Sequence, residues 1–158
     1  MGIETKIICD SVAPNGHRLT TFLLEYPRVI HAEMCRHRTH SRCVQSSRAV
    51  PIERVIKKIQ EDPFIPIYWG KNQKGMQADE EINLTQQIVA KGEILALRDT
   101  AIKSVEYLIK CGLHKQVLNR YLEPFMYMSE IVTGTDWGNF FNLRVHKDAE
   151  PHIRELAK

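Results

Sequence analysis

The sequence has little of what marks a secreted, membrane-spanning or disordered protein. Its 158 residues include only 8 glycines, 7 prolines and 4 cysteines, with no low-complexity tract or internal repeat. No apolar run approaches the length that crosses a bilayer, and the N-terminus lacks the apolar core of a signal peptide. We therefore expect a cytoplasmic protein with no membrane partner.

The cysteines are few and scattered. Cys9, Cys35, Cys43 and Cys111 include no CxxC pair. This spacing indicates neither a disulfide framework nor a common type of zinc site. We interpret all four as reduced thiols and expect two of them to lie in the core.

Neither sign of charge is in large excess. The formal net charge is only +3, so general affinity for nucleic acid is not implied and we expect no nucleic-acid partner. An apolar content of 43% and a charged content of 26% are typical of a soluble globular protein. The length is that of one domain with a sizeable core.

Positive charge is nevertheless concentrated in residues 35–48, which contain no carboxylate. Guanidinium groups and backbone amides of small residues give the short, charge-assisted hydrogen bonds that phosphate recognition needs. A solvated basic loop or an RNA-binding arm are the plainer alternatives. The basic side chains of this segment are Arg36, His37, Arg38, His40, Arg42 and Arg48.

The same segment allows two further interpretations. Cys35, His37, His40 and Cys43 are metal-ligand residue types, but their spacing matches no common zinc pattern and the neighbouring arginines would repel an ion. A thiol nucleophile formed by Cys43 with His40 is weaker still, because the sequence offers nothing to orient the base. We therefore expect no metal.

The apolar patterns predict an α+β fold, with a small mixed or antiparallel sheet flanked by helices. Residues 18–26 have apolar side chains on both faces, which predicts a central strand. Ile88, Leu95, Ile102 and Ile109 recur every seven residues and predict a seam buried in the monomer or between subunits. We expect segment 64–79 to pack on a neighbour or to cover the site. The expected strands are 3–12, 18–26 and 125–133, and the expected helices are 27–34, 51–61, 83–110, 114–122, 137–144 and 148–158.

The fixed spacing of one group of residues indicates a more specific function. The triplet Arg36-His37-Arg38 is followed after seven residues by Ser46, with Ser41 and Arg48 at two further fixed positions. This pattern resembles the signature of the flavin-dependent thymidylate synthases, the thymidylate synthase complementing protein family.

A second block supports the resemblance. Arg120, Asn139-Phe140, Leu143-Arg144 and 149–154 match family positions in the same order, so the resemblance spans roughly residues 18–158. It implies a single domain over residues 1–158, without the C-terminal extension that relatives often have. It also implies a homo-oligomer, which we expect to be a homotetramer with active sites between subunits.

The resemblance implies a specific reaction. Such enzymes convert dUMP to dTMP by reductive methylation at C5, within dTMP biosynthesis. The carbon comes from methylenetetrahydrofolate and the hydride from reduced FAD, which NADPH recharges. No protein nucleophile attacks the pyrimidine, and the protein supplies binding, orientation and electrostatics.

Residue roles follow from the same resemblance. Arg144 is the implied catalytic residue, lying against the uracil edge and stabilising negative charge there. Arg36, His37, Arg38 and Asn139 are the implied FAD contacts. The implied substrate-binding residues are Glu33, Arg36, Val44, Gln45, Ser46, Ser47, Arg48, Arg120 and Arg144.

The sequence departs from the family pattern near the site. Cys43 and Val44 stand where relatives have Asn-Glu, Glu33 replaces a glutamine, and Ala49 replaces an aromatic residue. No N-terminal flavin-contact motif is recognisable before His17. Two alternatives therefore stay open: a nucleotide-binding paralogue without flavin chemistry, and a related enzyme that modifies C5 of another pyrimidine nucleotide.

Overall fold

The computed structural model describes residues 2–158, which fold into two compact units. One unit comprises Met1–Gln45 and Tyr127–Lys158, and the other comprises Ser46–Met126. Each has its own hydrophobic core. Within residues 2–158, no helix is both long and apolar enough to cross a membrane.

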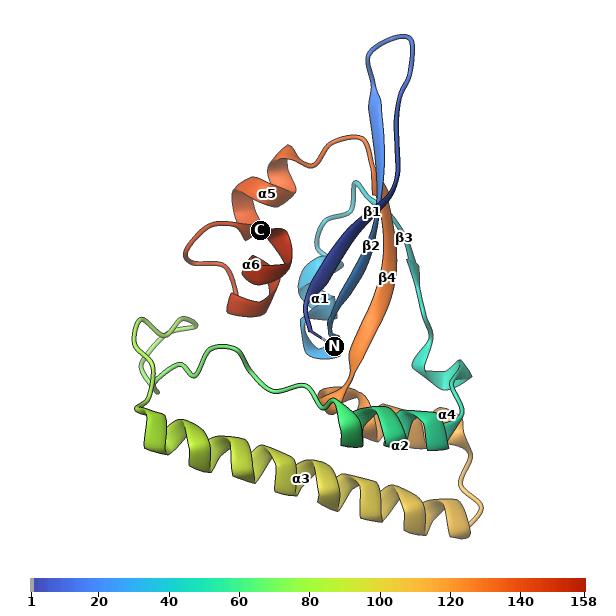
Figure 1. Ribbon diagram of the computed structural model, residues 1–158, viewed down its shortest axis with the longest axis vertical. Coiled ribbons are helices and arrows are strands. Elements are labelled where there is room, and N and C mark those ends of the chain that lie inside the picture. The colour runs from blue at the N-terminus through green and yellow to red at the C-terminus, as the bar shows by residue number, and fades with distance from the viewer. Residues whose placement is uncertain (1) are drawn as a thin grey trace. The chain divides into compact units, whose positions relative to one another are not determined.

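A four-stranded antiparallel sheet forms the centre of the first unit. The strand order is β1 (Glu4–Val12), β2 (Arg18–Pro27), β4 (Tyr127–Gly134) and β3 (Ser41–Val44) (Figure 1). The α+β prediction and three predicted strands are confirmed. The sequence analysis missed β3, because Ser-Arg-Cys-Val lacks the apolar alternation that marks a strand.

Helices cover one face of this sheet. They are α1 (His31–Met34), which follows a 3-10 turn at Arg28–Ile30, α5 (Gly138–Arg144) and α6 (Pro151–Ala157) (Figure 1). The predicted helix 148–158 begins later than expected, since Glu150 caps α6. The core between sheet and helices contains Leu24, Tyr26, Ile30, Met34, Met128, Val132, Phe140, Ile153 and Leu156.

The opposite face of the sheet is open. Leu19, Leu23 and Ile131 are 43%, 38% and 40% exposed, and Leu23 is paired with Ile131 across β2 and β4. The position of β2 inside the sheet is as predicted, but burial of both its faces is wrong for the single chain. The reason is that this unit's helices pack on one face only.

The second unit is helical. It contains α2 (Ile52–Glu61), α3 (Leu84–Lys110), α4 (Lys115–Leu122) and 3-10 turns at Ser47–Ala49 and Glu123–Phe125. Its core joins the apolar stripe of α2 to side chains of α3 and α4, and burial of this stripe reduces the exposed apolar surface. The core residues are Ile52, Val55, Ile56, Ile59, Ile102, Val105, Leu118, Leu122 and Phe125.

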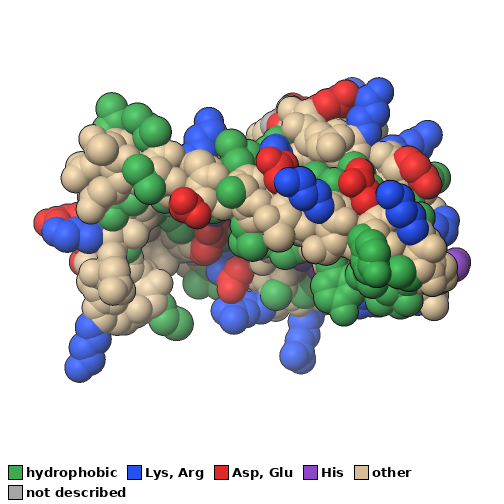
Figure 2. Space-filling view, turned by 90° about the horizontal axis from the view of Figure 1, so that it is seen from below, with side chains coloured by type: hydrophobic (Ala, Val, Ile, Leu, Met, Phe, Trp, Pro, Cys, Tyr) green, Lys and Arg blue, Asp and Glu red, His purple; other side chains and the backbone are tan. Residues whose placement is uncertain are grey.

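α3 begins at the expected position and is capped by Asn83. The Asn83 side chain accepts from Gln86 N at 2.9 Å, and the Gln86 side chain accepts from Asn83 N at 3.1 Å. Of the predicted seam only Ile102 is buried: it is 4% exposed, whereas Leu95 and Ile109 are half-buried and Ile88 is 64% exposed. Exposed apolar side chains are visible among charged ones in the space-filling view (Figure 2).

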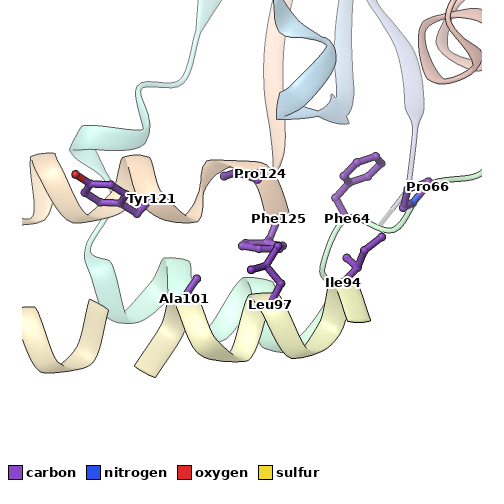
Figure 3. Close-up of a pocket in the computed structure, with 8 residues that line it drawn as sticks. All are labelled: Phe64, Pro66, Ile94, Leu97, Ala101, Tyr121, Pro124 and Phe125. Atoms are coloured by element: carbon purple, nitrogen blue, oxygen red, sulfur yellow. The ribbon is translucent and has the colours of Figure 1, made fainter. Parts of the chain in front are cut away.

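An apolar cavity of about 380 Å³ lies within the second unit. Ile94 and Leu97 of α3 face Phe64 and Phe125 across it (Figure 3). Phe64 also donates its backbone N–H to the Phe125 carbonyl at 2.9 Å. The start of segment 64–79 therefore packs on its own unit, and the lining of the cavity is mostly apolar.

The expectation that two cysteines lie in the core is wrong, whereas that of free thiols agrees with the structure. Cys9, Cys35, Cys43 and Cys111 are all exposed free thiols. Cys43 lies on the open face of the sheet, in register with Ile131. Cys111 ends α3 as its C-cap. A cysteine's apolar character alone does not determine on which face of a strand it lies.

Candidate functional site

The predicted signature begins at the end of α1. Cys35 is the C-cap of that helix, and Arg36-His37-Arg38 follow it directly. The chain then enters β3, which pairs with β4 in the register Ser41↔Thr133 through Val44↔Glu130. The loop is therefore fixed at both ends, by a helix and by a sheet strand.

Arg144 connects the last turn of α5 to this loop. Its Nε donates to His37 Nε2 at 2.8 Å. Its Nη1 donates to Glu33 Oε2 at 3.2 Å, and its Nη2 lies 3.4 Å from the Glu33 carbonyl oxygen. The Arg144 side chain is only 13% exposed. The structure thus brings together three residues that the sequence analysis assigned to the site.

These contacts leave part of the guanidinium available. An arginine side chain carries about five N–H donors in a planar fork. Arg144 uses one on each of its three nitrogens. Among residues 2–158, one N–H on each terminal nitrogen therefore makes no protein hydrogen bond and can donate to a bound acceptor.

His37 is buried and held neutral. Only 7% of the residue is exposed, and its ring packs edge-on against Phe140 with centroids 4.9 Å apart. Burial, followed by the positive charge of Arg144, lowers the pKa of His37 below its ordinary value. A neutral ring is required here, because Nε2 must accept the N–H of Arg144. Arg42 Nη2 fixes the backbone by donating to the His37 carbonyl at 2.8 Å.

His40 packs behind the loop. Its ring stacks on Trp137 with centroids 4.0 Å apart, and Nε2 lies 3.0 Å from the Asp136 carbonyl oxygen. A Cβ at Gly134 would approach the His40 ring to 2.6 Å, so this close packing requires glycine. Trp137 thus serves as a packing residue for the His40 ring.

The remaining predicted cofactor residues are accessible. The Arg36 side chain is 70% exposed, with Nη1 3.4 Å from Glu33 Oε2. Arg38 and Asn139 are exposed, and within residues 2–158 Arg38 forms no ion pair. His37 differs from them, because its ring binds Arg144 and supports the loop from inside.

The substituted family positions lie at the end of β3. Val44 is half-buried against the core of the first unit, and Gln45 is exposed. Glu130 lies opposite Val44 on β4 and is 1% exposed. Position 44 therefore carries no carboxylate, while the Glu130 carboxylate is buried on the neighbouring strand.

The other predicted nucleotide-binding residues belong to the second unit. Ser46 and Arg48 are exposed, but Ser47 is 8% exposed and its Oγ donates to Glu123 Oε1 at 2.5 Å. The Ser47 carbonyl accepts from Asn119 Nδ2 at 2.6 Å. Ser47 is therefore part of the support of the turn that carries Arg48.

Asn119 holds that turn against α4. It is fully buried, and Nδ2 also donates to the Val50 carbonyl at 2.9 Å. Arg120, the next residue, is exposed in the last turn of α4. Arg48 and Arg120 therefore lie on two elements joined by hydrogen bonds. The sequence analysis missed Asn119, although it is adjacent to the matched arginine.

Among the described residues, no cluster of side chains has the geometry of a metal site. Across positions 2–158, no three His, Cys, Asp or Glu side chains are grouped as ligands of one ion.

The chain matches the model of a known protein family. The family model of the thymidylate synthase complementing protein matches residues 12–158. Because the match covers nearly the whole sequence, the chain belongs to this family. The resemblance seen in the sequence is thereby confirmed. A search of curated proteins found no significant match.

Solved structures share the fold. A crystal structure of a UMP/dUMP methylase, PolB from Streptomyces cacaoi, bound with 5-Br UMP, is similar with a TM-score of 0.77 and 15% identity. The similarity covers 98% of this chain and 85% of that one. The same methylase bound with 5-Br dUMP gives a TM-score of 0.69 at 15% identity, covering 98% and 86% of the two chains.

Proposed function

We propose that this protein methylates C5 of a pyrimidine nucleoside monophosphate, converting dUMP to dTMP with methylenetetrahydrofolate, FAD and NADPH. Family membership and the signature loop support the proposal. The observation that carries it is the contact of Arg144 with Glu33 and His37, which holds a guanidinium of low exposure in a fixed position.

Arg144 would stabilise the nucleotide as its ring becomes reactive. When C5 acts as a nucleophile, negative charge develops on the uracil edge. A fixed cation at low exposure stabilises such charge more strongly than water does, because it needs no reorientation. Glu33 and His37 supply that fixation. Because the lowered pKa of His37 favours its neutral ring, the positive charge of the site lies on the arginines.

Arg48 and Arg120 would bind the phosphate of the nucleotide. Both are exposed, and both lie in the second unit on elements that Asn119 joins. An arginine fork matches phosphate oxygens in bidentate geometry. The exposed Ser46 would add a hydroxyl donor. Loss of one charged hydrogen bond costs about 1.5–3 kcal/mol, which is roughly ten- to a hundredfold in binding.

The described residues fit a flavin dinucleotide. Its diphosphate needs cations, and Arg36 and Arg38 are exposed, Arg38 without an ion-pair partner among the residues described. Asn139 adds an exposed amide at the start of α5. When bound, FAD supplies the hydride for the reductive step. The chain's part is to bind and orient it, and to hold the nucleotide's charge through Arg144.

UMP is a second candidate substrate. The S. cacaoi protein of the same fold is a UMP/dUMP methylase and was crystallised with nucleotides of both sugars. Val44 and Glu33 also differ from the residues usual in the family. We therefore include UMP beside dUMP as a substrate to be tested.

A homo-oligomer is part of the proposal. The open sheet face exposes Leu19, Leu23 and Ile131, and α3 exposes Ile88 and Leu97. Apolar surface of this kind is stabilised by burial against another chain. We infer a homotetramer, and sedimentation velocity of the purified protein tests it.

The activity test uses the purified protein with FAD, NADPH and methylenetetrahydrofolate. Either dUMP or UMP is added, and the methylated nucleotide is identified by mass spectrometry. Formation of dTMP supports the proposal as stated, and formation of 5-methyl-UMP alone moves it to the second substrate. Nucleotide binding without FAD binding or product would favour the flavin-free paralogue.

A further inference from the structure

His40 joins the signature loop, residues 36–40, to the connection between β4 and α5. Its Nε2 lies 3.0 Å from the carbonyl oxygen of Asp136. Because a carbonyl oxygen can only accept, His40 Nε2 must carry the proton of this hydrogen bond. The ring also stacks on Trp137, the next residue, with centroids 4.0 Å apart. His40 therefore holds two consecutive residues of the connection by two kinds of contact.

The surroundings of His40 leave its ring little freedom. The residue is 8% exposed, and Phe140 of α5 lies edge-on to its ring with centroids 6.1 Å apart. A Cβ at Gly134 would approach the ring to 2.6 Å, so the ring lies directly against the backbone of β4. Buried donors in proteins are nearly always paired. Burial and packing therefore keep the donor of His40 directed at the Asp136 carbonyl.

The two segments that His40 joins both carry proposed flavin contacts. Arg36, His37 and Arg38 precede His40 in the loop, and Asn139 lies at the start of α5. The side chains of Arg36, Arg38 and Asn139 are exposed. A ligand that is bound by both segments at once requires them to keep a fixed position relative to each other.

His40 and Arg144 attach the loop at opposite ends of α5. Arg144, in the last turn of the helix, donates to His37, whereas His40 contacts the residues just before the first turn. The seven residues of α5 span about 10 Å. A single contact would leave the loop free to rotate about it, but two contacts separated by this distance fix its orientation to the helix.

We propose that His40 is a positioning residue for flavin binding, which fixes the signature loop against α5 so that the exposed side chains of both segments bind one FAD molecule. Because its own ring is buried, His40 acts through the β4–α5 connection rather than by contact with the cofactor. The role in flavin binding rests on the proposed function, whereas the coupling of the loop to α5 depends on the fold alone.

Three variants separate the hydrogen bond from the packing. His40→Phe keeps a ring against Trp137 but has no donor. His40→Gln loses the ring but keeps an N–H donor near the position of Nε2, whereas His40→Asn carries the same amide on a shorter side chain. Thr5→Val is the matched control, because it removes another hydrogen bond to a carbonyl of the same unit, from Thr5 Oγ1 to Leu156 O at 3.2 Å. Circular dichroism checks the fold, and the pair His40→Asn and His40→Gln decides alone if His40→Phe does not fold.

Hydrogen–deuterium exchange with mass spectrometry measures the coupling in the protein without cofactor or substrate. We expect the amides of residues 36–44 and 138–144 to exchange about two- to tenfold faster in His40→Phe and His40→Asn than in the wild-type protein, because one hydrogen bond is lost. His40→Gln and Thr5→Val should stay near the wild-type rates. Equal rates in His40→Asn and His40→Gln, or equally raised rates in Thr5→Val, would overturn the proposal.

Titration with FAD, followed by flavin fluorescence, tests the role in cofactor binding. The Kd for FAD should rise roughly tenfold in His40→Asn, because the two segments no longer keep one orientation, and should change little in His40→Gln and Thr5→Val. An unchanged Kd in His40→Asn would show that His40 does not position the flavin contacts. Absence of FAD binding by the wild-type protein would instead contradict the proposed function, and the exchange rates would still decide whether His40 couples the loop to α5.

Discussion

The Nε atom of Arg144 donates to Nε2 of His37 over 2.8 Å, and this bond joins residues 107 positions apart in the sequence. It brings the second arginine-bearing block of the sequence into contact with the first. The bond requires a neutral imidazole, which burial and nearby positive charge provide. Glu33 completes the contact by pairing with the same guanidinium.

Replacing Arg144 by alanine should abolish methylation without preventing folding. Loss of a preorganised charge at a developing anion typically costs about 10²–10³ in kcat. Arg144→Lys should also be severely impaired, because an ammonium lacks the planar fork. Product formation is measured alongside far-ultraviolet circular dichroism. A folded and fully active Arg144→Ala protein would remove Arg144 from the reaction.

Replacing Glu33 by glutamine should loosen Arg144. The amide keeps the shape of the side chain but loses the charge that strengthens the contact with Nη1. Charged hydrogen bonds contribute about 1.5–3 kcal/mol, so we expect roughly a tenfold or larger fall in kcat/KM. Glu106→Gln, at an exposed position of α3, is the matched control. Equal activity of the two variants would show that the pairing is not functional.

Acidification should weaken the fold through His37. The pKa of His37 lies below its ordinary value of 6.5, so the unfolded chain binds the proton first as the pH falls. The contribution of His37 makes the free energy of unfolding decrease from about pH 6.5 down to the folded-state pKa. Urea unfolding at several pH values measures this. His37→Gln should show a flatter profile, whereas His17→Gln, in an exposed turn, should keep the wild-type slope.

Arg48→Ala should weaken nucleotide binding. Its exposed guanidinium is the proposed phosphate ligand, and its loss should reduce affinity roughly ten- to a hundredfold. Calorimetric titration with dUMP measures the change, and Arg54→Ala on the exposed side of α2 is the control. The same affinity in both variants would exclude Arg48 from the phosphate site.

Local signals predicted the helices well. The expected helices 51–61 and 83–110 agree with α2 and α3, which begin just after Pro51 and at the Asn83–Gln86 capping box. These features depend on neighbouring residues, so they can be read from the sequence. β3 could not, because its four residues become a strand only through pairing with β4, about 85 positions later.

The sequence predicted candidate site residues but not their contacts. The signature indicated Arg36, His37 and Arg38 and the second block Arg144, yet nothing local indicated that His37 binds Arg144 or that Ser47 binds Glu123. Both contacts depend on tertiary packing.

The most direct test of the central claim is an absorption spectrum of the purified protein with added FAD, followed by titration with dUMP. The account predicts a bound-flavin spectrum that shifts as dUMP occupies the adjoining site, and a smaller shift in Arg144→Ala. Absence of flavin binding under all conditions would contradict the account and leave a nucleotide-binding member of the family without flavin chemistry.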